Sequence, residues 1–215
     1  MAITGLCKAV KETETISGDN YSVLQSETGK KIILLSDGTG SGKRAHADSG
    51  RVLDLMEKML EAGFDITTAA GMVNASLFAK AEESNHPTLD ICSLDLYKGT
   101  CDLYKIGGAV SFIKRGKTVE KLQQETLPLG IFQNMEVSMI HRELEEGDYL
   151  IMMTDGVLDA IEESDCEEIM AETIRNLPER NPQEMAELLQ QFILRSCGGH
   201  ILDDMTIMVV GIWEN

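Results

Sequence analysis

The sequence predicts an α+β protein in which antiparallel strands form most of the framework and the helices come in separate groups. Three observations support this prediction. Short apolar segments are separated by glycine-containing turns, two segments with helical periodicity follow each other directly, and a third amphipathic segment lies near the C-terminus. The 215 residues fit one domain of ordinary size, so we expect a single domain over residues 1–215.

The first third of the chain predicts three strands followed by two helices. The predicted strands are Ala2–Val10, Tyr21–Ser26 and Lys31–Ser36. The last of them is apolar at most positions, which is typical of a strand buried on both faces. Apolar residues at helical spacing between Val52 and Leu60 predict the first helix, which Gly63 can end. Asp65 can cap a second helix whose apolar side runs from Ile66 to Phe78.

The rest of the chain predicts antiparallel hairpins and one further helix. The predicted strands of the middle are Leu89–Tyr97, Cys101–Ile106, Ser111–Lys114, Thr118–Leu122, Val137–Arg142 and Tyr149–Thr154. Asn181 and Pro182 have the form of a helix start, a cap followed by a first-turn proline. Apolar residues from Met185 to Ile193 form the buried side of that helix, and a final strand, Met205–Ile212, is apolar on both faces.

The composition argues against several classes of partner. The chain has 19 basic and 36 acidic residues, for a net charge of −17 at pH 7. Nucleic acid and anionic membranes are therefore not expected partners of this domain, because phosphate binding requires clustered Lys and Arg. The sequence contains no apolar stretch of the ~20 residues that a membrane span requires. We expect a cytoplasmic protein with reduced cysteines, and whether it is the cytoplasmic domain of a membrane-anchored parent stays open.

Four aspartates lie at the ends of predicted strands. Asp37 and Asp155 each follow an apolar strand and precede a glycine, Asp19 lies just before a strand, and Asp203 lies just before the final strand. Carboxylates from neighbouring strands can converge at a sheet edge, where a hard divalent cation offsets their repulsion. Asp-Gly is also a common turn dipeptide. Spacing alone therefore leaves a metal site and ordinary turns as alternatives.

The order of these motifs resembles that of the PP2C (PPM) type metal-dependent serine/threonine phosphatases, in their bacterial branch. The motifs are Gly18-Asp19, Asp37-Gly38, Asp155-Gly156 and Asp203-Asp204-Met205-Thr206. Segments 17–22, 36–42, 111–116, 127–131 and 203–206 are similar to C-terminal phosphatase domains of the stage II sporulation protein E type. The resemblance covers nearly the whole chain. It implies a PP2C-like α/β/β/α sandwich of two antiparallel sheets flanked by helix pairs, with two Mn²⁺ or Mg²⁺ ions at one end.

The resemblance also implies a role for each site residue. By analogy, Asp37 bridges both ions and the Gly38 carbonyl ligates one of them. Asp155 and Asp203 hold the first ion, while Asp19 reaches the second through water. Asp37, Asp155 and Asp203 are then the catalytic residues of a reaction in which a metal-bridging hydroxide attacks phosphorus.

The chain departs from the eukaryotic relatives directly after the first Asp-Gly pair. Those relatives carry a histidine there, often taken as the general acid, whereas this chain has Thr39. A threonine hydroxyl is too weak an acid for that role. We therefore expect water to protonate the leaving group.

The resemblance implies a protein substrate as well. The expected partner is a phosphorylated anti-anti-sigma factor, whose dephosphorylation releases a sigma factor in sporulation. Two alternatives remain: a phosphatase-fold module that binds such a partner without turnover, and a stand-alone phosphatase of a stress pathway. The presence of all four aspartates favours an enzyme. The oligomeric state stays open, with a homodimer as one of the states to test.

Overall fold

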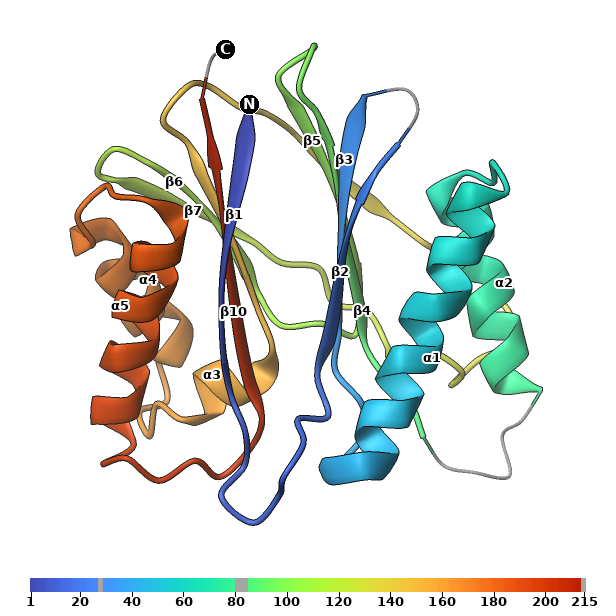
Figure 1. Cartoon of the computed structure of the whole chain (residues 1–215), viewed down its shortest axis with the longest axis horizontal. Coiled ribbons are helices and arrows are strands. Elements are labelled where there is room, and N and C mark those ends of the chain that lie inside the picture. The colour runs from blue at the N-terminus through green and yellow to red at the C-terminus, as the bar shows by residue number, and fades with distance from the viewer. Residues whose placement is uncertain (27–28, 80–84, 214–215) are drawn as a thin grey trace. The chain divides into compact units, whose positions relative to one another are not determined.

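A computed structural model describes residues 1–26, 29–79 and 85–213 (Figure 1). The chain divides into two compact units. Unit 1 consists of Met1–Ser17, Ala109–Gln123 and Leu144–Asn215, and unit 2 consists of Gly18–Gly108 and Gln124–Glu143. Each unit holds a five-stranded antiparallel sheet together with helices, which confirms the predicted α+β class with two antiparallel sheets. That residues 1–215 act as a single domain stays a prediction.

The sheet of unit 1 has the strand order β1-β10-β9-β6-β7. These strands are β1 (Ala2–Ala9), β6 (Ser111–Arg115), β7 (Thr118–Leu122), β9 (Tyr149–Met153) and β10 (Met205–Ile212). All eight residues of β10 are buried, as its apolar sequence predicts. The helices of this unit are α3 (Asp155–Asp159), α4 (Cys166–Asn176) and α5 (Pro182–Ser196). The predicted cap of α5 is confirmed, because the Asn181 side chain accepts a hydrogen bond from the Gln183 amide at 2.9 Å.

The short helices α3 and α4 were not predicted from the sequence. Helix α4 buries Met170, Ala171 and Ile174, and Ile169 packs against the same core, so its apolar residues recur at helical spacing and the sequence analysis missed this signal. Helix α3 has five residues and begins with the Asp155-Gly156 pair, which is also typical of a turn. Among the residues that the structure describes, no helix is both long and apolar enough to cross a lipid bilayer.

The sheet of unit 2 has the strand order β2-β3-β4-β5-β8. These strands are β2 (Asn20–Gln25), β3 (Lys30–Ser36), β4 (Leu89–Asp95), β5 (Thr100–Ile106) and β8 (Met139–Glu143). Helices α1 (Gly42–Glu61) and α2 (Ile66–Phe78) lie on one face of this sheet (Figure 1). Residues Leu34, Val52 and Val73 belong to the apolar core between them. Asp65 caps α2 as predicted, accepting a hydrogen bond from the Thr68 amide at 2.9 Å.

The sheet of unit 2 also carries a buried ion pair. Lys105 of β5 donates a hydrogen bond to Oδ2 of Asp90 in the neighbouring strand β4, and their side chains are only 0% and 3% exposed. Their strand neighbours Leu89 and Ile106 belong to the core beneath the helices. Because side chains alternate along a strand, the pair lies on the face of the sheet away from α1 and α2. Burial raises the pKa of Asp90, and the Lys105 ammonium opposes that rise.

Candidate metal centre

Asp19 and Asp37 lie at the same edge of the unit 2 sheet. Asp19 immediately precedes β2 and Asp37 immediately follows β3. The adjacent residues Asn20 and Ser36 are register partners in this antiparallel pair, which places the two aspartates at neighbouring strand ends. The Asp19 side chain is fully buried and Asp37 is partly buried. The predicted positions of both aspartates at strand ends are confirmed.

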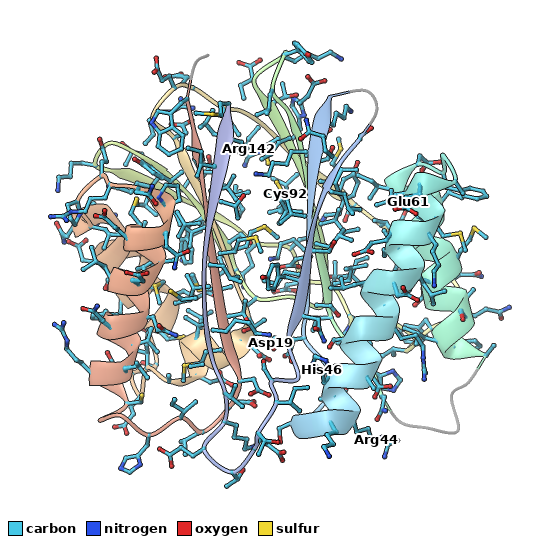
Figure 2. All side chains as sticks on the ribbon, in the orientation of Figure 1. Asp19, Arg44, His46, Glu61, Cys92 and Arg142 are labelled. Atoms are coloured by element: carbon cyan, nitrogen blue, oxygen red, sulfur yellow. The ribbon has the colours of Figure 1, made fainter. Side chains whose placement is uncertain are left out.

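Helix α1 holds the segment that carries Asp19. The Asn20 side-chain amide donates to the His46 carbonyl at 3.0 Å and to the Ser49 hydroxyl at 2.9 Å. Ser49 in turn donates to the carbonyl of Gly18. Figure 2 shows Asp19 and His46 at the same end of this unit, where α1 begins. These bonds attach the first half of α1 to the segment beside Asp19.

The Asp37-Gly38 segment packs against the same helix. A Cβ atom added at Gly38 would lie 2.1 Å from the carbonyl oxygen of Ala45 in α1, much closer than real side chains allow. Glycine is therefore required at position 38 for the peptide to lie this close to the helix. Because Gly38 has no side chain, none can block access to its carbonyl oxygen. This fits the predicted use of that oxygen as a metal ligand.

Asp155 and Asp203 form a corresponding arrangement in unit 1. Asp155 follows β9 and begins α3, and Asp203 lies two residues before β10, the strand next to β9. The Thr154 amide donates to the Thr206 carbonyl at 3.1 Å, and the Thr206 amide donates to the Thr154 hydroxyl at 2.9 Å. These bonds hold the end of β9 against the start of β10. A Cβ atom at Gly156 would lie 2.2 Å from the Asp204 carbonyl oxygen, so glycine is required here too.

The carboxylates of this edge repel one another. Burial raises the pKa of Asp203, and the nearby carboxylates of Asp155 and Asp204 raise it further, against the opposing effects of the Asp204 amide and Lys11. The pKa of Asp159 is also raised, first by burial and then by Asp155 and Asp203. Both shifts mean that the ionised carboxylates lack sufficient compensation from the protein itself. A divalent cation is the group that would supply it.

Asp159 was missed in the sequence analysis, although a signal for it exists. It follows Asp155 by four residues within α3, a spacing that places both side chains on one side of a helix. Asp204, by contrast, accepts a hydrogen bond from the Lys11 amide at 3.0 Å. That contact gives Asp204 a structural role in holding the segment after β1.

The predicted ligands thus fall into two groups. Asp19, Asp37 and Gly38 lie together in unit 2, and Asp155 and Asp203 lie together in unit 1. Within the described part of the chain, neither unit alone gathers three or more His, Cys, Asp or Glu side chains that could hold a metal ion. All proposed donors are oxygen atoms, which fits Mn²⁺ or Mg²⁺ and disfavours softer metals. A shared site with ligands from both units stays a prediction.

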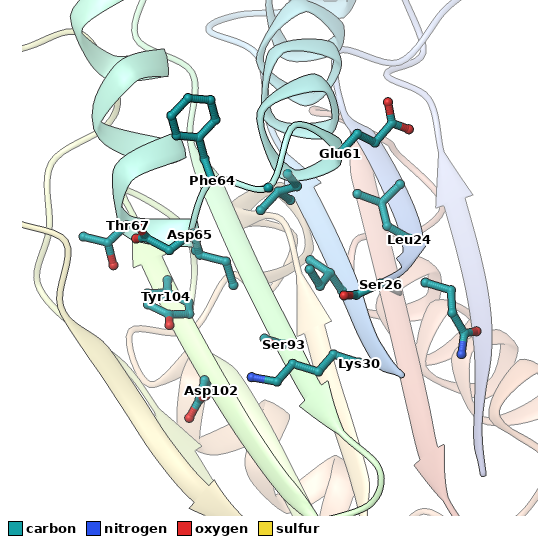
Figure 3. Close-up of a pocket in the computed structure, with 15 residues that line it drawn as sticks. Leu24, Ser26, Lys30, Glu61, Phe64, Asp65, Thr67, Ser93, Asp102 and Tyr104 are labelled. Atoms are coloured by element: carbon teal, nitrogen blue, oxygen red, sulfur yellow. The ribbon is translucent and has the colours of Figure 1, made fainter. Parts of the chain in front are cut away.

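Unit 2 contains a pocket of about 780 Å³ (Figure 3). It is lined by the end of α1, the start of α2 and the adjacent sheet, including Lys30, Phe64 and Tyr104. Lys30 begins β3, whereas Asp37 follows its last residue, so the pocket and the metal ligands are separated by about 20 Å of strand. The pocket is therefore not the predicted metal centre.

Comparison with known proteins identifies the family. The family model of stage II sporulation protein E (SpoIIE) matches residues 27–213. The chain belongs to the SpoIIE family. The resemblance inferred from the order of the aspartate motifs is thereby confirmed.

Relatives with known names or structures support this assignment. The chain is 37% identical over 213 residues to stage II sporulation protein E of Bacillus subtilis (strain 168), covering 99% of this chain and 26% of that protein. A solved structure of the PP2C phosphatase domain and a regulatory-domain fragment of Bacillus subtilis SpoIIE matches with a TM-score of 0.92 and 37% identity, covering 100% of this chain and 64% of that one. Phosphoserine phosphatase RsbU of Bacillus subtilis (strain 168) is 21% identical over 203 residues, or 91% of this chain and 59% of RsbU. The chain thus spans about a quarter of the length of SpoIIE and has the fold of its PP2C phosphatase domain.

Proposed function

We propose that this SpoIIE-family chain is a metal-dependent protein serine phosphatase. The observation that carries the proposal is the family match over residues 27–213 together with the two groups of aspartates at strand ends. In this proposal Asp37, Gly38 and Asp19 from unit 2 act with Asp155 and Asp203 from unit 1 to hold two Mn²⁺ or Mg²⁺ ions. Asp159 lies close enough to influence the charge of Asp155 and Asp203 and adds to the negative field of the site.

Bound divalent cations of this kind activate a water molecule and neutralise the charge of a phosphoryl group. The contribution of the protein is to place the ligands, whereas the positive charge that favours their ionised form would come from the cations. In the loop after Asp37, the Thr39 hydroxyl is too weak an acid to protonate the leaving group. It accepts a hydrogen bond from the His86 amide. Water is therefore the proton donor to the leaving serine oxygen in this proposal.

Hydrolysis of p-nitrophenyl phosphate tests the metal-dependent activity. The purified chain should release p-nitrophenol with Mn²⁺ present, lose that activity when EDTA is added, and regain it when Mn²⁺ is restored in excess. Activity that persists after complete chelation would reject the metal centre. A chain that binds a phosphorylated partner tightly but never releases phosphate would instead be a binding module.

The proposed substrate is phosphoserine on a folded anti-anti-sigma factor. The SpoIIE family match and the similarity to a phosphoserine phosphatase support this choice. The net charge of −17 disfavours binding of small anionic phosphoesters over most of the surface. Selectivity would then come from protein–protein contact that orients the phosphoserine at the metal centre.

We expect a phosphorylated anti-anti-sigma factor to be hydrolysed with kcat/KM at least ~100-fold above that of a phosphoserine peptide with the same local sequence, or about 2.7 kcal/mol. Phosphate release from both substrates, measured at equal Mn²⁺ concentration, checks this prediction. A heat-unfolded sample of the same phosphoprotein is the matched control and should behave like the peptide. Equal efficiency on the folded protein and the peptide would indicate a phosphatase of broad specificity.

Sedimentation of the same samples would show whether the chain is a homodimer.

A further inference from the structure

Thr39 follows the proposed metal ligands Asp37 and Gly38 directly, and its hydroxyl is engaged. The Thr39 Oγ1 atom accepts a hydrogen bond from the backbone N–H of His86 at 2.7 Å. The two residues are 47 positions apart in the sequence, and both lie in unit 2. The threonine side chain therefore ties the metal-ligand loop to a distant segment of the same unit.

The segment around His86 also binds the beginning of that loop. The Asp37 amide donates to the Thr88 hydroxyl at 3.1 Å, and the Thr88 amide donates to the Asp37 carbonyl at 2.9 Å. The loop from Asp37 to Thr39 is thus held at both ends by segment 86–88. Between these two attachments, Gly38 packs directly against Ala45 of α1.

Segment 86–88 is itself attached to the core of unit 2. The His86 ring nitrogen Nδ1 donates to the Leu129 carbonyl at 3.2 Å, and the Leu129 amide donates to the Pro87 carbonyl at 3.0 Å. The Leu129 side chain is fully buried in the apolar core. The next amide, that of Gly130, donates at 2.8 Å to the side chain of Asn74, a buried residue of α2. The anchor that Thr39 uses is therefore a fixed one.

The metal-ligand loop needs such an anchor because of its composition. Glycine occupies positions 38, 40 and 42, and Gly40 and Gly42 adopt positive φ angles of 87° and 74°. Glycine gives a chain more accessible conformations, which must be given up when the loop adopts one ligand geometry. The side-chain hydrogen bond of Thr39, which lies between Gly38 and Gly40, restricts the conformations of this glycine-rich segment.

We propose that Thr39 is a positioning residue for the metal centre. By binding the His86 amide, its hydroxyl holds the Asp37-Gly38 peptide in the conformation that ligates the ion. This inference rests on the proposed metal-dependent function. It gives the position after the Asp-Gly pair a structural use, in place of the general-acid role often assigned to the histidine that eukaryotic relatives carry there.

The test compares Thr39→Val with Thr39→Ser. Valine keeps the shape and the β-branched backbone preference but removes the hydroxyl, whereas serine keeps the hydroxyl. Thr39 is exposed, so neither variant should disturb the core. The dissociation constant for Mn²⁺ is measured by calorimetric titration of each chain with Mn²⁺ alone. It should be about fivefold higher in Thr39→Val than in wild type, or about 1 kcal/mol, and within about twofold of wild type in Thr39→Ser. Amide hydrogen exchange of the metal-free chain should be faster at His86 in the valine variant only.

Asp37→Asn separates the failure of this inference from the failure of the proposed function. If Asp37→Asn loses Mn²⁺ binding while Thr39→Val binds as tightly as wild type, the metal centre stands and the role of Thr39 is refuted. Equal weakening in the serine and valine variants would also refute it, because the hydroxyl would then not be the group that matters. Unchanged binding in Asp37→Asn would reject the metal centre itself and the inference with it.

Discussion

Replacing Asp37 with asparagine is expected to lower the Mn²⁺-dependent hydrolysis of p-nitrophenyl phosphate by at least about 10³-fold, or about 4 kcal/mol of transition-state stabilisation. The family resemblance assigns Asp37 contact with both ions, so the neutral amide of asparagine should weaken the binding of both. The substitution keeps the size of the side chain. The backbone contacts of Asp37 with Thr88 involve main-chain atoms and do not depend on the carboxylate.

A matched control is available on the same unit. Asp54 of α1 is an exposed aspartate whose carboxylate pairs with Lys58 one turn later. Asp54→Asn removes the same charge from a surface site and should leave the hydrolysis rate unchanged. Thermal unfolding of the metal-free variants establishes that both are folded. If Asp37→Asn and Asp54→Asn retain comparable rates, the assignment of Asp37 to the metal centre is wrong.

The strands and the long helices could be predicted because local sequence determines them strongly. Strand β10 is apolar at consecutive positions and is buried throughout, and Asp65 and Asn181 provide side-chain caps that bind the first turn of their helices. Helix α4 was not predicted, although Ile169, Met170 and Ile174 recur at helical spacing and pack against the core. How strands separated in sequence join into two sheets, such as β1 with β10, depends on contacts between the two ends of the chain.

The charged residues of the candidate site could be predicted from the sequence, but the hydrogen bonds that hold them in place could not. Aspartates at strand ends are visible in the sequence, and the register of β2 with β3 and of β9 with β10 brings them together in pairs. Asp159 was missed because it lies in α3, a five-residue helix that was not predicted, so its position one turn after Asp155 was not recognised. The contact between Thr39 and His86 could not be foreseen, because it joins residues 47 positions apart through a backbone amide.

The buried pair of Lys105 and Asp90 leads to an expected loss of stability. We expect Lys105→Met to lower the free energy of unfolding by about 3–5 kcal/mol at pH 7, because it leaves a buried carboxylate without its counter-ion. The second oxygen of Asp90, Oδ1, has no hydrogen-bond partner among the described residues that could take over. Urea unfolding measures the change. Lys105→Met combined with Asp90→Leu removes both charges and should recover most of the loss.

The size of this loss should depend on pH in a defined direction. Burial already raises the pKa of Asp90, and without the opposing Lys105 charge the folded-state pKa rises further. The cost belongs to the ionised carboxylate, so it is fully present above the folded-state pKa and declines as the pH falls through it. The difference in stability between Lys105→Met and wild type should therefore be smaller at about pH 5 than at pH 7.

Lys114→Met is the matched control, because this equally buried lysine of unit 1 donates to the backbone carbonyls of Gly116 and Arg175. Its loss should not change over that pH range, and a pH-independent loss in Lys105→Met as well would mean that Asp90 is not the residue that Lys105 stabilises.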